Sequence, residues 1–219
     1  MIACGEGSPD ASGSPHTKGG GHSASCIADY AQKPCTLFTP ELVKGAFADF
    51  PSEIETAETR PTNSCQHSWA GDRIQRLQMG SFEVEVPRDN RVAISWIQRK
   101  DRENPEAWFR QVYRTLSEEE KIEAQAALDQ ALAKQSEGLS EEQRNLAGSL
   151  GRGLIASREY EILEGVGTVA AWDASPMAPT LKVLDGDTEF GIEVDVSDDS
   201  NTNRELAIAL ARAVIAACP

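Results

Sequence analysis

The spacing of five cysteines constrains the fold of this chain more than any other feature of its sequence. They are Cys4, Cys26, Cys35, Cys65 and Cys218. If Cys4 carries a covalent modification, four cysteines remain, and four can pair in three ways. Zinc sites favour cysteines a few residues apart or with histidines close by, whereas these four are spread over almost the whole sequence. The spacing therefore indicates two structural disulfides, which form in an oxidising compartment.

One pairing of the four cysteines is favoured over the other two. Cys35 precedes an expected helix and Cys65 begins an expected strand, so a bridge between them would tie that helix to the sheet. Cys26 and Cys218 lie near the two ends of the expected domain, and the termini of a domain often lie close together at its surface. We therefore expect the disulfides Cys35–Cys65 and Cys26–Cys218.

The N-terminal sequence Met-Ile-Ala-Cys resembles the cleavage end of a bacterial lipoprotein signal, in which the cysteine, here Cys4, receives the lipid. Only three residues precede Cys4, so the basic start and the apolar run of roughly 7–15 residues of such a signal are missing. We expect the native gene to encode them upstream of Met1. The alternative is a cytosolic protein with an incidental cysteine.

Residues 1–25 are expected to form a lipoprotein N-terminus and a disordered tether, and residues 26–219 a single domain. The tether segment has almost no apolar side chains and is rich in Gly and Ser, so it cannot bury enough surface to fold. A flexible segment of this kind would hold a domain away from a membrane. The length of the remainder suits one sizeable hydrophobic core.

The net charge of the chain is −14 at pH 7 and is spread along the sequence. Affinity for nucleic acids depends on clustered Lys and Arg side chains, so no nucleic-acid partner is expected. No run of 18 apolar residues is present that would span a membrane. The expected partners are a membrane, which the lipid contacts, and another envelope protein, and the expected state is a monomer.

The first part of the domain is expected to contain a helix, a short strand and a hairpin. Thr39 and Pro40 have the residue types of an N-cap and a first helical position, and Pro51 ends the apolar stripe that follows. Apolar residues alternate with polar ones over residues 65–69, 82–86 and 92–96. The segment Pro87-Arg88-Asp89-Asn90 is typical of the turn between the last two strands. Residues 70–80 show no clear period.

Residues 104–157 have the pattern of a helical insertion with three helix starts. Asn104 precedes a proline, and two capping boxes follow at Ser117 with Glu120 and at Ser140 with Gln143. We expect this insertion to be an excursion from the sheet rather than part of its core. Three strands are expected over 166–172, 181–184 and 190–196, with a final amphipathic helix that ends at Cys218. The order of elements indicates an α+β fold with a central antiparallel sheet.

The chain also resembles a known family at particular residues. They are Cys35-Thr-Leu-Phe-Thr-Pro-Glu before a helix, Cys65 and Trp69 in a strand, Gly165-Val-Gly-Thr-Val-Ala-Ala-Trp172, the strand TEFGIEVDVS and the final Ala/Leu-rich helix. This order is similar to that of small bacterial envelope lipoproteins of unknown function with a PsbP-like fold. The resemblance covers residues 35–217 apart from the helical insertion. It implies an α/β/α sandwich, with the central sheet flanked by the N- and C-terminal helices, and it supplies no catalytic residues.

No catalytic, cofactor-binding or metal-binding residue is assigned from the sequence. His16 and His22 lie in the tether without a rigid third ligand, and His67 is interpreted as a structural histidine of a strand. Catalysis by a Ser-His-Asp triad needs a sharply exposed nucleophile, and no G-x-S-x-G motif is present.

Two further motifs are interpreted as structural. Residues 195–203 place oxygen side chains at alternate positions, as a calcium loop does, but Ser200 and Leu206 stand where the loop needs Gly and Glu. We interpret this segment as a polar loop in which Asn201 or Asn203 caps the last helix. Residues 148–153 contain three glycines without the spacing of a phosphate-binding loop, and we interpret them as positions of close helix packing.

These observations favour a lipid-anchored, non-enzymatic binding or interaction module on the periplasmic or extracytoplasmic face of the cell envelope. A small-ligand sensor domain, or an envelope hydrolase whose site is assembled only in three dimensions, are the alternatives. A cavity lined by Trp69, Trp96 or Trp172 with convergent polar groups would favour the sensor. A pocket that pairs His67 with a carboxylate and a serine would favour the hydrolase.

Overall fold

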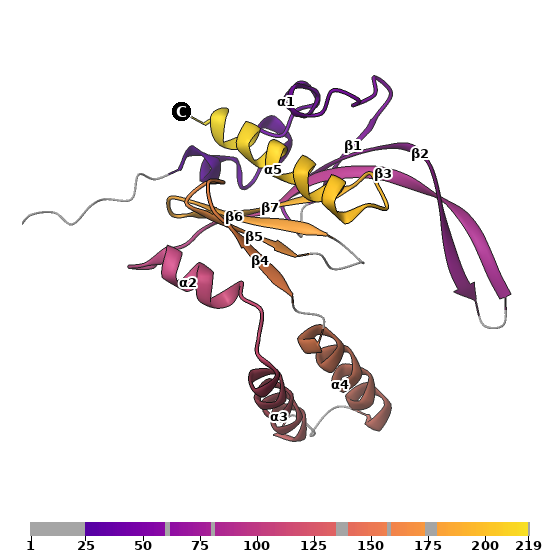
Figure 1. Cartoon of the computed structure of the whole chain (residues 1–219), viewed down its shortest axis with the longest axis vertical. Coiled ribbons are helices and arrows are strands. Elements are labelled where there is room, and N and C mark those ends of the chain that lie inside the picture. Colours follow the sequence, from indigo (N-terminus) through magenta and orange to yellow (C-terminus); the bar gives the residue numbers. More distant parts are fainter. Residues whose placement is uncertain are drawn as a thin grey trace, which may run out of the picture.

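A seven-stranded antiparallel sheet forms the body of the protein in the computed structural model, which describes residues 25–59, 62–79, 82–134, 140–156, 159–173 and 179–218 (Figure 1). The order across the sheet is β1-β2-β3-β7-β6-β5-β4, which confirms the α+β class. The strands are β1 (Glu55–Thr59), β2 (Ser64–Met79), β3 (Phe82–Arg99), β4 (Tyr160–Leu163), β5 (Val169–Asp173), β6 (Thr180–Asp185) and β7 (Thr188–Asp195). Sequence patterns missed β1, whose side chains are all exposed, and β4, whose side chains are mostly partly buried.

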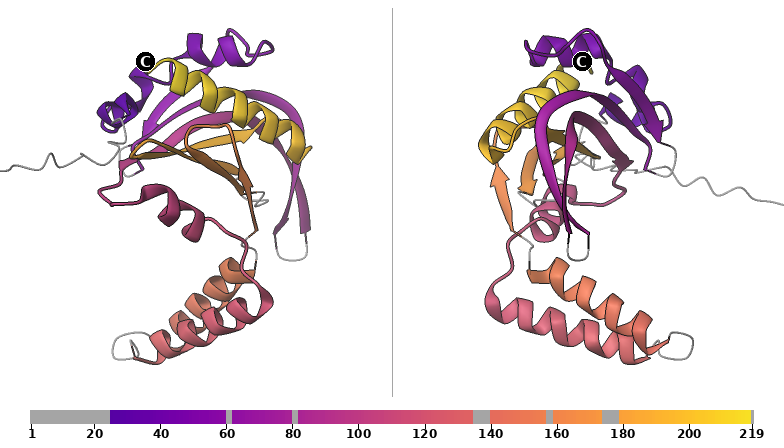
Figure 2. Two further views of the ribbon diagram at one scale, coloured as in Figure 1. Left: turned by 60° about the vertical axis from the view of Figure 1, so that its left-hand side comes forward. Right: turned by 90° about the vertical axis from the view of Figure 1, so that its right-hand side faces the viewer.

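Helices α1 (Pro40–Ala46) and α5 (Ser200–Ala216) lie together on one face of the sheet and contact each other (Figures 1 and 2). The apolar stripe of α5, which includes Leu206, Leu210 and Val214, packs on the alternate side chains of the central strands. The N-terminal and C-terminal helices therefore form one layer, and they do not lie on opposite faces. None of the described helices is long and apolar enough to cross a membrane.

Helix α2 (Pro105–Val112) covers part of the second face of the sheet (Figure 2). Phe109 is completely buried and packs against Val169, Ala171 and Leu184. Asn104 caps the helix by accepting a hydrogen bond from the Ala107 N–H, as its sequence predicts. The expectation that all of residues 104–157 lie outside the core is wrong for this helix, because a buried aromatic ring on a sheet face is core packing.

Helices α3 (Glu118–Lys134) and α4 (Glu141–Ala156) form a hairpin that projects away from the sheet (Figure 2). Both predicted capping boxes are present, because the hydroxyls of Ser117 and Ser140 accept hydrogen bonds from the backbone three residues later. Gly151 lies against α3, where a Cβ atom would be 2.5 Å from Leu128 Cδ2. The interpretation as a position of close helix packing is therefore correct for Gly151, whereas a Cβ atom at Gly153 would meet no atom within 4 Å.

The prediction of a hairpin turn at residues 87–90 is wrong. Strand β3 runs unbroken through these residues and pairs with β2 from Cys65↔Ile94 to Met79↔Phe82, so the two strands form one long ribbon. Pro87 is tolerated because β7 pairs with β3 only from Arg91 onward, which leaves one edge of β3 free there. We call the part of the ribbon that extends beyond the sheet, residues 73–79 and 82–88, the arm (Figure 1).

Two disulfides tie the N-terminal segment to the body. They join Cys35 to Cys65 and Cys26 to Cys218, with Cα separations of 4.9 and 5.6 Å. This is the pairing that the positions of the cysteines favour. The first bridge attaches the segment before α1 to β2, and the second attaches the start of the described chain to the end of α5. Both disulfides indicate an oxidising, extracytoplasmic environment.

Candidate functional site

The candidate site lies where the arm leaves the sheet, at an irregularity between β2 and β3. The pairing shifts register between Trp69 and Arg73, so β2 carries two more residues than β3 over this stretch. Gly71 lies in the irregularity, where a Cβ atom would be 2.5 Å from the Arg88 carbonyl oxygen. Only glycine allows this approach of the two backbones, and bulges of this kind bend and twist a ribbon.

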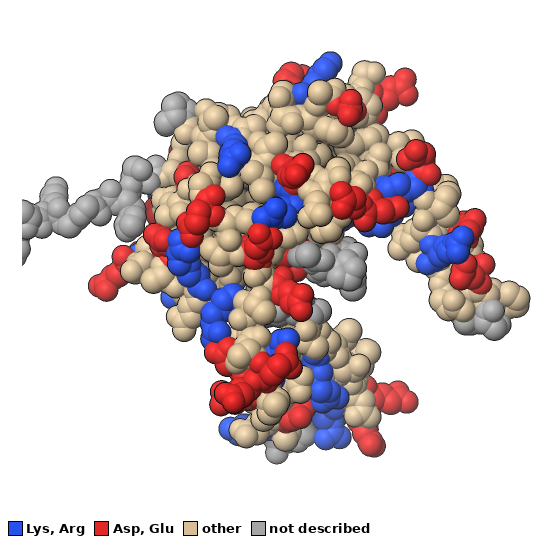
Figure 3. All heavy atoms as spheres, in the orientation of Figure 1, with Lys and Arg blue, Asp and Glu red and all other residues tan. Residues whose placement is uncertain are grey.

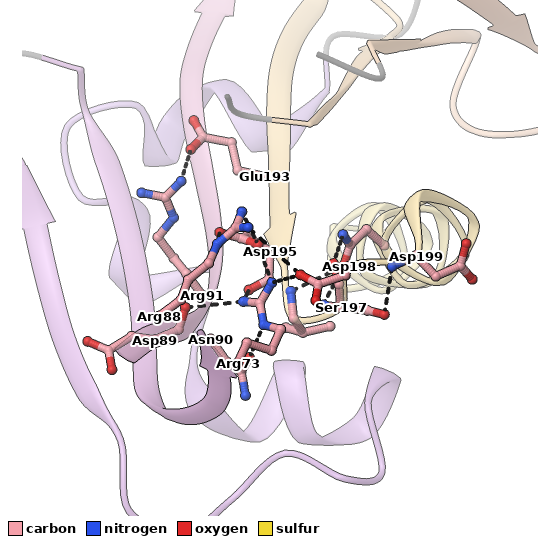
Figure 4. Close-up of polar contacts among 12 residues, drawn as sticks. Arg73, Arg88, Asp89, Asn90, Arg91, Glu193, Asp195, Ser197, Asp198 and Asp199 are labelled. Atoms are coloured by element: carbon pink, nitrogen blue, oxygen red, sulfur yellow. Dashed lines mark hydrogen bonds and ion pairs between the residues drawn. The ribbon is translucent and has the colours of Figure 1, made fainter. Parts of the chain in front are cut away.

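Arg73 is held at the root of the arm by Asp195, the last residue of β7 (Figure 4). Its guanidinium donates to Asp195 Oδ1 and to the Asp195 carbonyl oxygen, each at 2.7 Å. It also donates to Asn90 Oδ1 at 3.1 Å and to the Asp89 carbonyl oxygen at 3.2 Å. The Arg73 side chain is only 9% exposed, and these four contacts satisfy a charge that would otherwise be costly to bury.

A second arginine of the arm contacts the same carboxylate. Arg88 donates from Nε to Asp195 Oδ2 at 3.1 Å, and its Nη2 lies 2.8 Å from Asp195 Oδ1. Asp198, in the loop after β7, is 3.6 Å from Arg73 and 3.9 Å from Arg88 but is 76% exposed. Asp195 thus joins the arm to the body, and Asp198 adds a weak, solvent-screened attraction.

A polar hollow of about 520 Å³ lies beside this junction. The body contributes Gln66, Ser68, Arg91 and Asp195, of which Ser68, Arg91 and Asp195 stand opposite one another on β2, β3 and β7. The arm and its root contribute Gln75, Arg88 and Asp89. Side chains alternate along a strand, so the body residues belong to the sheet face that bears α2 and not to the apolar core.

Several side chains in the hollow are not used by the fold. Gln66, Ser68 and Gln75 make no side-chain hydrogen bond to any residue that the structure describes, and neither does the Asp89 carboxylate. The nearest carboxylate oxygen to the Arg91 guanidinium is Glu193 Oε2, 3.9 Å away, and this is too long for a hydrogen bond. The hollow therefore presents two amides, a hydroxyl, a guanidinium and a carboxylate to solvent.

A second hollow, of about 290 Å³, adjoins the first and shares Ser68 and Asp89 with it. Trp69 lines this second hollow. Its ring packs edge-on against Phe50, with centroids 5.2 Å apart and an interplanar angle of 84°, so its orientation is fixed by the core. Trp172 is buried, and half-exposed Trp96 lies on an irregularity of β3 with a positive φ of 56°. Neither of these two tryptophans lines either hollow.

The sheet face next to the hollow is densely charged. Ser95 donates to Glu193 at 3.1 Å, and Lys182 lies on the neighbouring strand β6. Burial lowers the pKa of the Lys182 ammonium, and the nearby carboxylates of Glu189 and Glu193 oppose this by raising it. Figure 3 shows acidic and basic side chains interspersed on the arm and the α3–α4 hairpin, as the even distribution of charge in the sequence suggests.

The structure gives each residue singled out in the sequence a place or leaves it outside the described residues. Cys4, His16 and His22 lie outside them. His67 is fully buried beneath α1, with Nε2 2.8 Å from the Phe38 carbonyl oxygen and Nδ1 2.9 Å from Thr56 Oγ1. A carbonyl oxygen can only accept, so Nε2 carries the proton, and burial lowers the pKa of the imidazole.

The loop at residues 195–203 caps the last helix, but not through the predicted asparagines. Asp199 is the N-cap and accepts from the N–H groups of Asn201 and Thr202. Asn203 is buried and binds back to the backbone of Val196 and Ser197. Among the described residues no group of three His, Cys, Asp or Glu side chains is placed to hold a metal ion.

Sequence reasoning missed the hollow because its residues come from three strands. The one signal in the sequence is the segment at residues 87–91, which interrupts an alternating pattern and has the composition of a turn. Comparison of the chain with models of known families, with characterised proteins and with solved structures finds no match.

Proposed function

We propose that this chain is an extracytoplasmic, lipid-anchored binding protein that takes a small polar ligand in the hollow at the root of the arm. The observation that carries the proposal is the set of unused polar groups in the hollow, beside Arg73, which four hydrogen bonds hold in place. These side chains make no hydrogen bond to another described side chain, so their donors and acceptors are available to a ligand. Binding pockets instead combine a rigid frame with a few convergent polar groups.

Anchoring through a lipid on Cys4 is part of the proposal. The cysteine and the Gly/Ser-rich tract after it support this, together with the extracytoplasmic environment that the disulfides indicate. A single acyl chain gives marginal membrane attachment, so stable anchoring requires more than one. Mass spectrometry of the N-terminal peptide of the protein from its own host should show a multiply acylated Cys4. An unmodified N-terminus that begins at Met1 would contradict it.

We also propose a relationship to the envelope lipoproteins with a PsbP-like fold. The order of a helix, antiparallel strands and a final helix supports it, and so does the link between Cys35 and the strand that begins near Cys65. An experimental structure would test the relationship by superposition on a member of that family. Agreement in strand order and helix placement is the expected result.

Binding without catalysis is the proposed activity. The partners of His67 are Thr56 and a backbone carbonyl, on the sheet face opposite the hollow, so it is not paired with a serine or a carboxylate there. The Ser95 hydroxyl is buried and donates to Glu193, so it is not exposed as a nucleophile. These contacts support the binding module over the hydrolase.

Equilibrium dialysis of the purified full chain against small molecules extracted from its host, read by mass spectrometry, tests the proposal. We expect at least one polar compound to be retained by the protein. A Ser68→Trp variant, which fills the hollow, should lose it, whereas a Gln130→Trp variant, altered at an exposed position of α3, should retain it. Equal retention by both variants would contradict binding in the hollow.

A second candidate function is docking onto another envelope protein. Exposed apolar side chains on the arm and the helical hairpin favour it: Phe82 is 74% and Ile122 66% exposed. Both elements project from the body in the views of Figure 2. Cross-linking in the host membrane through a photoreactive residue at position 84, an exposed position of the arm close to Phe82, tests this function. A single partner, lost in a Phe82→Ser variant, is the expected result.

A further inference from the structure

The outer edge of β2 in the arm carries a row of backbone groups that no described strand pairs. β1 pairs with β2 only as far as Ser68, so no described strand lies beside β2 on this side along residues 73–79. Figures 1 and 2 show the arm standing away from the body beyond its root. An isolated two-stranded ribbon is marginally stable in water, and a further strand with an apolar face stabilises it. The arm is therefore suited to accept a strand at this edge.

The two faces of the arm differ in character. Leu77 and Val84 lie directly opposite each other, and Phe82 lies two residues from Val84 on the same side, so these three residues form an apolar face. All three are exposed. On the opposite face Arg76 forms an ion pair with Glu85 at 3.1 Å. A strand added at the β2 edge would enlarge the apolar face if it carried an apolar side chain beside Leu77.

The outer edge of β3 is protected against pairing with a second copy of itself. It is free from residue 82 to residue 90, because β7 pairs with β3 only from Arg91 onward, and Pro87 has no N–H to donate there. Two copies of one edge, related by a two-fold axis, pair antiparallel with residues of the same face opposite each other. With the axis at any residue from 83 to 89, like charges stand opposite each other, which is destabilising. The charged residues concerned are Glu83, Glu85, Arg88 and Asp89.

The outer edge of β2 lacks this protection. Residues 73–79 contain two arginines but no acidic residue and no proline. With the axis at Leu77, the leucines of the two copies stand opposite each other on the apolar face, and Arg76 stands opposite Gln78 of the second copy. Leu77 lies toward the tip of the arm, so this axis keeps the two acidic bodies apart and limits their repulsion.

We propose that two copies of this chain associate through the outer edge of β2, with the two-fold axis at Leu77. The two arms then form one four-stranded antiparallel sheet in the order β3-β2-β2-β3, and the apolar faces of both arms become continuous. The outward edges of this sheet are the protected β3 edges, so assembly ends at the dimer. The inference does not depend on the proposed ligand binding, which concerns the hollow at the root of the arm.

Sedimentation equilibrium of the full chain tests the proposal. One strand edge buries less area than a standard interface, so we expect a monomer–dimer equilibrium with a Kd of about 10–500 µM. Leu77→Lys and Leu77→Glu variants should each be monomeric, because like charges then meet at the axis. An equal mixture of the two variants should dimerise again, because an ammonium group then faces a carboxylate.

Val84→Lys is the matched control. Val84 lies opposite Leu77 on the same face and is 39% exposed against 38%, but it belongs to β3, away from the axis. This variant should dimerise as the wild type does. If it were monomeric as well, the contact would involve the apolar face and the edge pairing would be wrong.

Three further outcomes would overturn the proposal. They are a wild type that stays monomeric up to about 0.5 mM, a dimer that survives in Leu77→Lys, and a mixture of the two Leu77 variants that stays monomeric. The dialysis experiment judges ligand binding separately, because a monomer can retain a ligand in the hollow. Unfolding curves of each variant ensure that lost association is not lost structure.

Discussion

Asp195 shows how one side chain can hold two parts of a molecule together. It is 14% exposed and receives hydrogen bonds from Arg73 and Arg88, both on the ribbon that leaves the sheet. Removing one partner of a largely buried ion pair leaves the other charge without compensation, which costs more than the pair itself contributes. The stability of the junction between arm and body therefore depends chiefly on the Asp195 carboxylate.

An Asp195→Ala variant should be destabilised by about 2–4 kcal/mol, because Arg73 stays buried without its main acceptor. Urea unfolding followed by circular dichroism measures the change. Asp198→Ala is the matched control: it removes a carboxylate from the same arginines, but this one is 76% exposed. We expect it to cost less than about 0.5 kcal/mol. Equal losses in the two variants would show that the Asp195 contact does not hold the arm.

His67 should give the protein a pH dependence between neutral and mildly acidic conditions. Its pKa is lowered from the ordinary value of 6.5, chiefly by burial, so the folded state keeps the imidazole neutral where the unfolded chain takes up a proton. The unfolded state therefore binds more protons below pH 6.5, and the free energy of unfolding falls from there toward the lowered pKa. It is independent of this group above pH 6.5.

Unfolding curves at about pH 7.5, 6.5 and 5.5 measure this effect in the wild type and in a His67→Gln variant. The glutamine amide can still donate to the Phe38 carbonyl oxygen but does not titrate. We expect the variant to be less stable at every pH and to show a shallower fall below pH 6.5. The same slope in both proteins would assign the pH dependence to other groups.

At the scale of elements, the helical insertion has two unlike parts. Helix α2 places Phe109 on the sheet and is fixed by Tyr113, whose hydroxyl donates to Glu189 at 2.7 Å. The α3–α4 hairpin is held mainly by its own packing, and α3 has no buried residue. The two chain segments that connect this hairpin to the body lie side by side. Thr115 Oγ1 donates a hydrogen bond to the Tyr160 carbonyl oxygen and accepts one from the Tyr160 N–H, each at 3.0 Å.

Replacing residues 117–158 with four Gly/Ser residues should therefore leave a cooperatively folded domain. The change in unfolding free energy should stay within about 1 kcal/mol, because the removed hairpin buries little of the sheet. A Phe109→Ala variant of the full chain should lose about 3–5 kcal/mol, as expected for a buried aromatic ring. Calorimetry on both proteins gives the comparison. Loss of the cooperative transition in the deletion variant would show that the hairpin belongs to the core.

The same elements show which features a sequence can reveal. The caps at Thr39, Asn104, Ser117 and Ser140 could be predicted, because a cap is decided by residues at most three positions apart. The ribbon could not, because Pro87 and its neighbours have the composition of a turn and only the pairing with residues 73–79 makes them a strand. The Arg73–Asp195 contact joins residues 122 positions apart, beyond any local pattern.

At the scale of the whole molecule, the two disulfides fasten the N-terminal segment at both of its ends. The Cys26–Cys218 bridge joins residues 192 positions apart, and the Cys35–Cys65 bridge joins residues 30 positions apart. In the Cys35–Cys65 bridge Cys65 is completely buried and Cys35 is partly exposed, whereas both cysteines of the Cys26–Cys218 bridge are partly exposed. The bridge that closes nearly the whole chain is thus the more accessible of the two.

Mild reduction of the native protein should open Cys26–Cys218 first, because exchange requires a thiolate to reach a disulfide sulfur. Brief treatment with a low concentration of dithiothreitol, alkylation and peptide mass spectrometry should label Cys26 and Cys218 before Cys35 and Cys65. If all four cysteines were labelled at the same rate, and only under unfolding conditions, the two disulfides would be equally protected by the fold. Cys26→Ala/Cys218→Ala should remain folded but with a lower midpoint of urea unfolding.

The bend at Gly71 has a mechanical consequence. The arm beyond it holds seven residues of β2 and extends about 20 Å at the usual rise of a strand. A pivot that turns by about 10° would move the far end of such an arm by roughly 3–4 Å. Gln75 lies on the arm beyond Gly71, Gln66 and Arg91 lie on the sheet, and Arg88 is joined to the sheet through Asp195. If the proposed ligand binds between Gln66 and Gln75, it would set the angle of the arm, and binding would displace Phe82 at the tip of the arm.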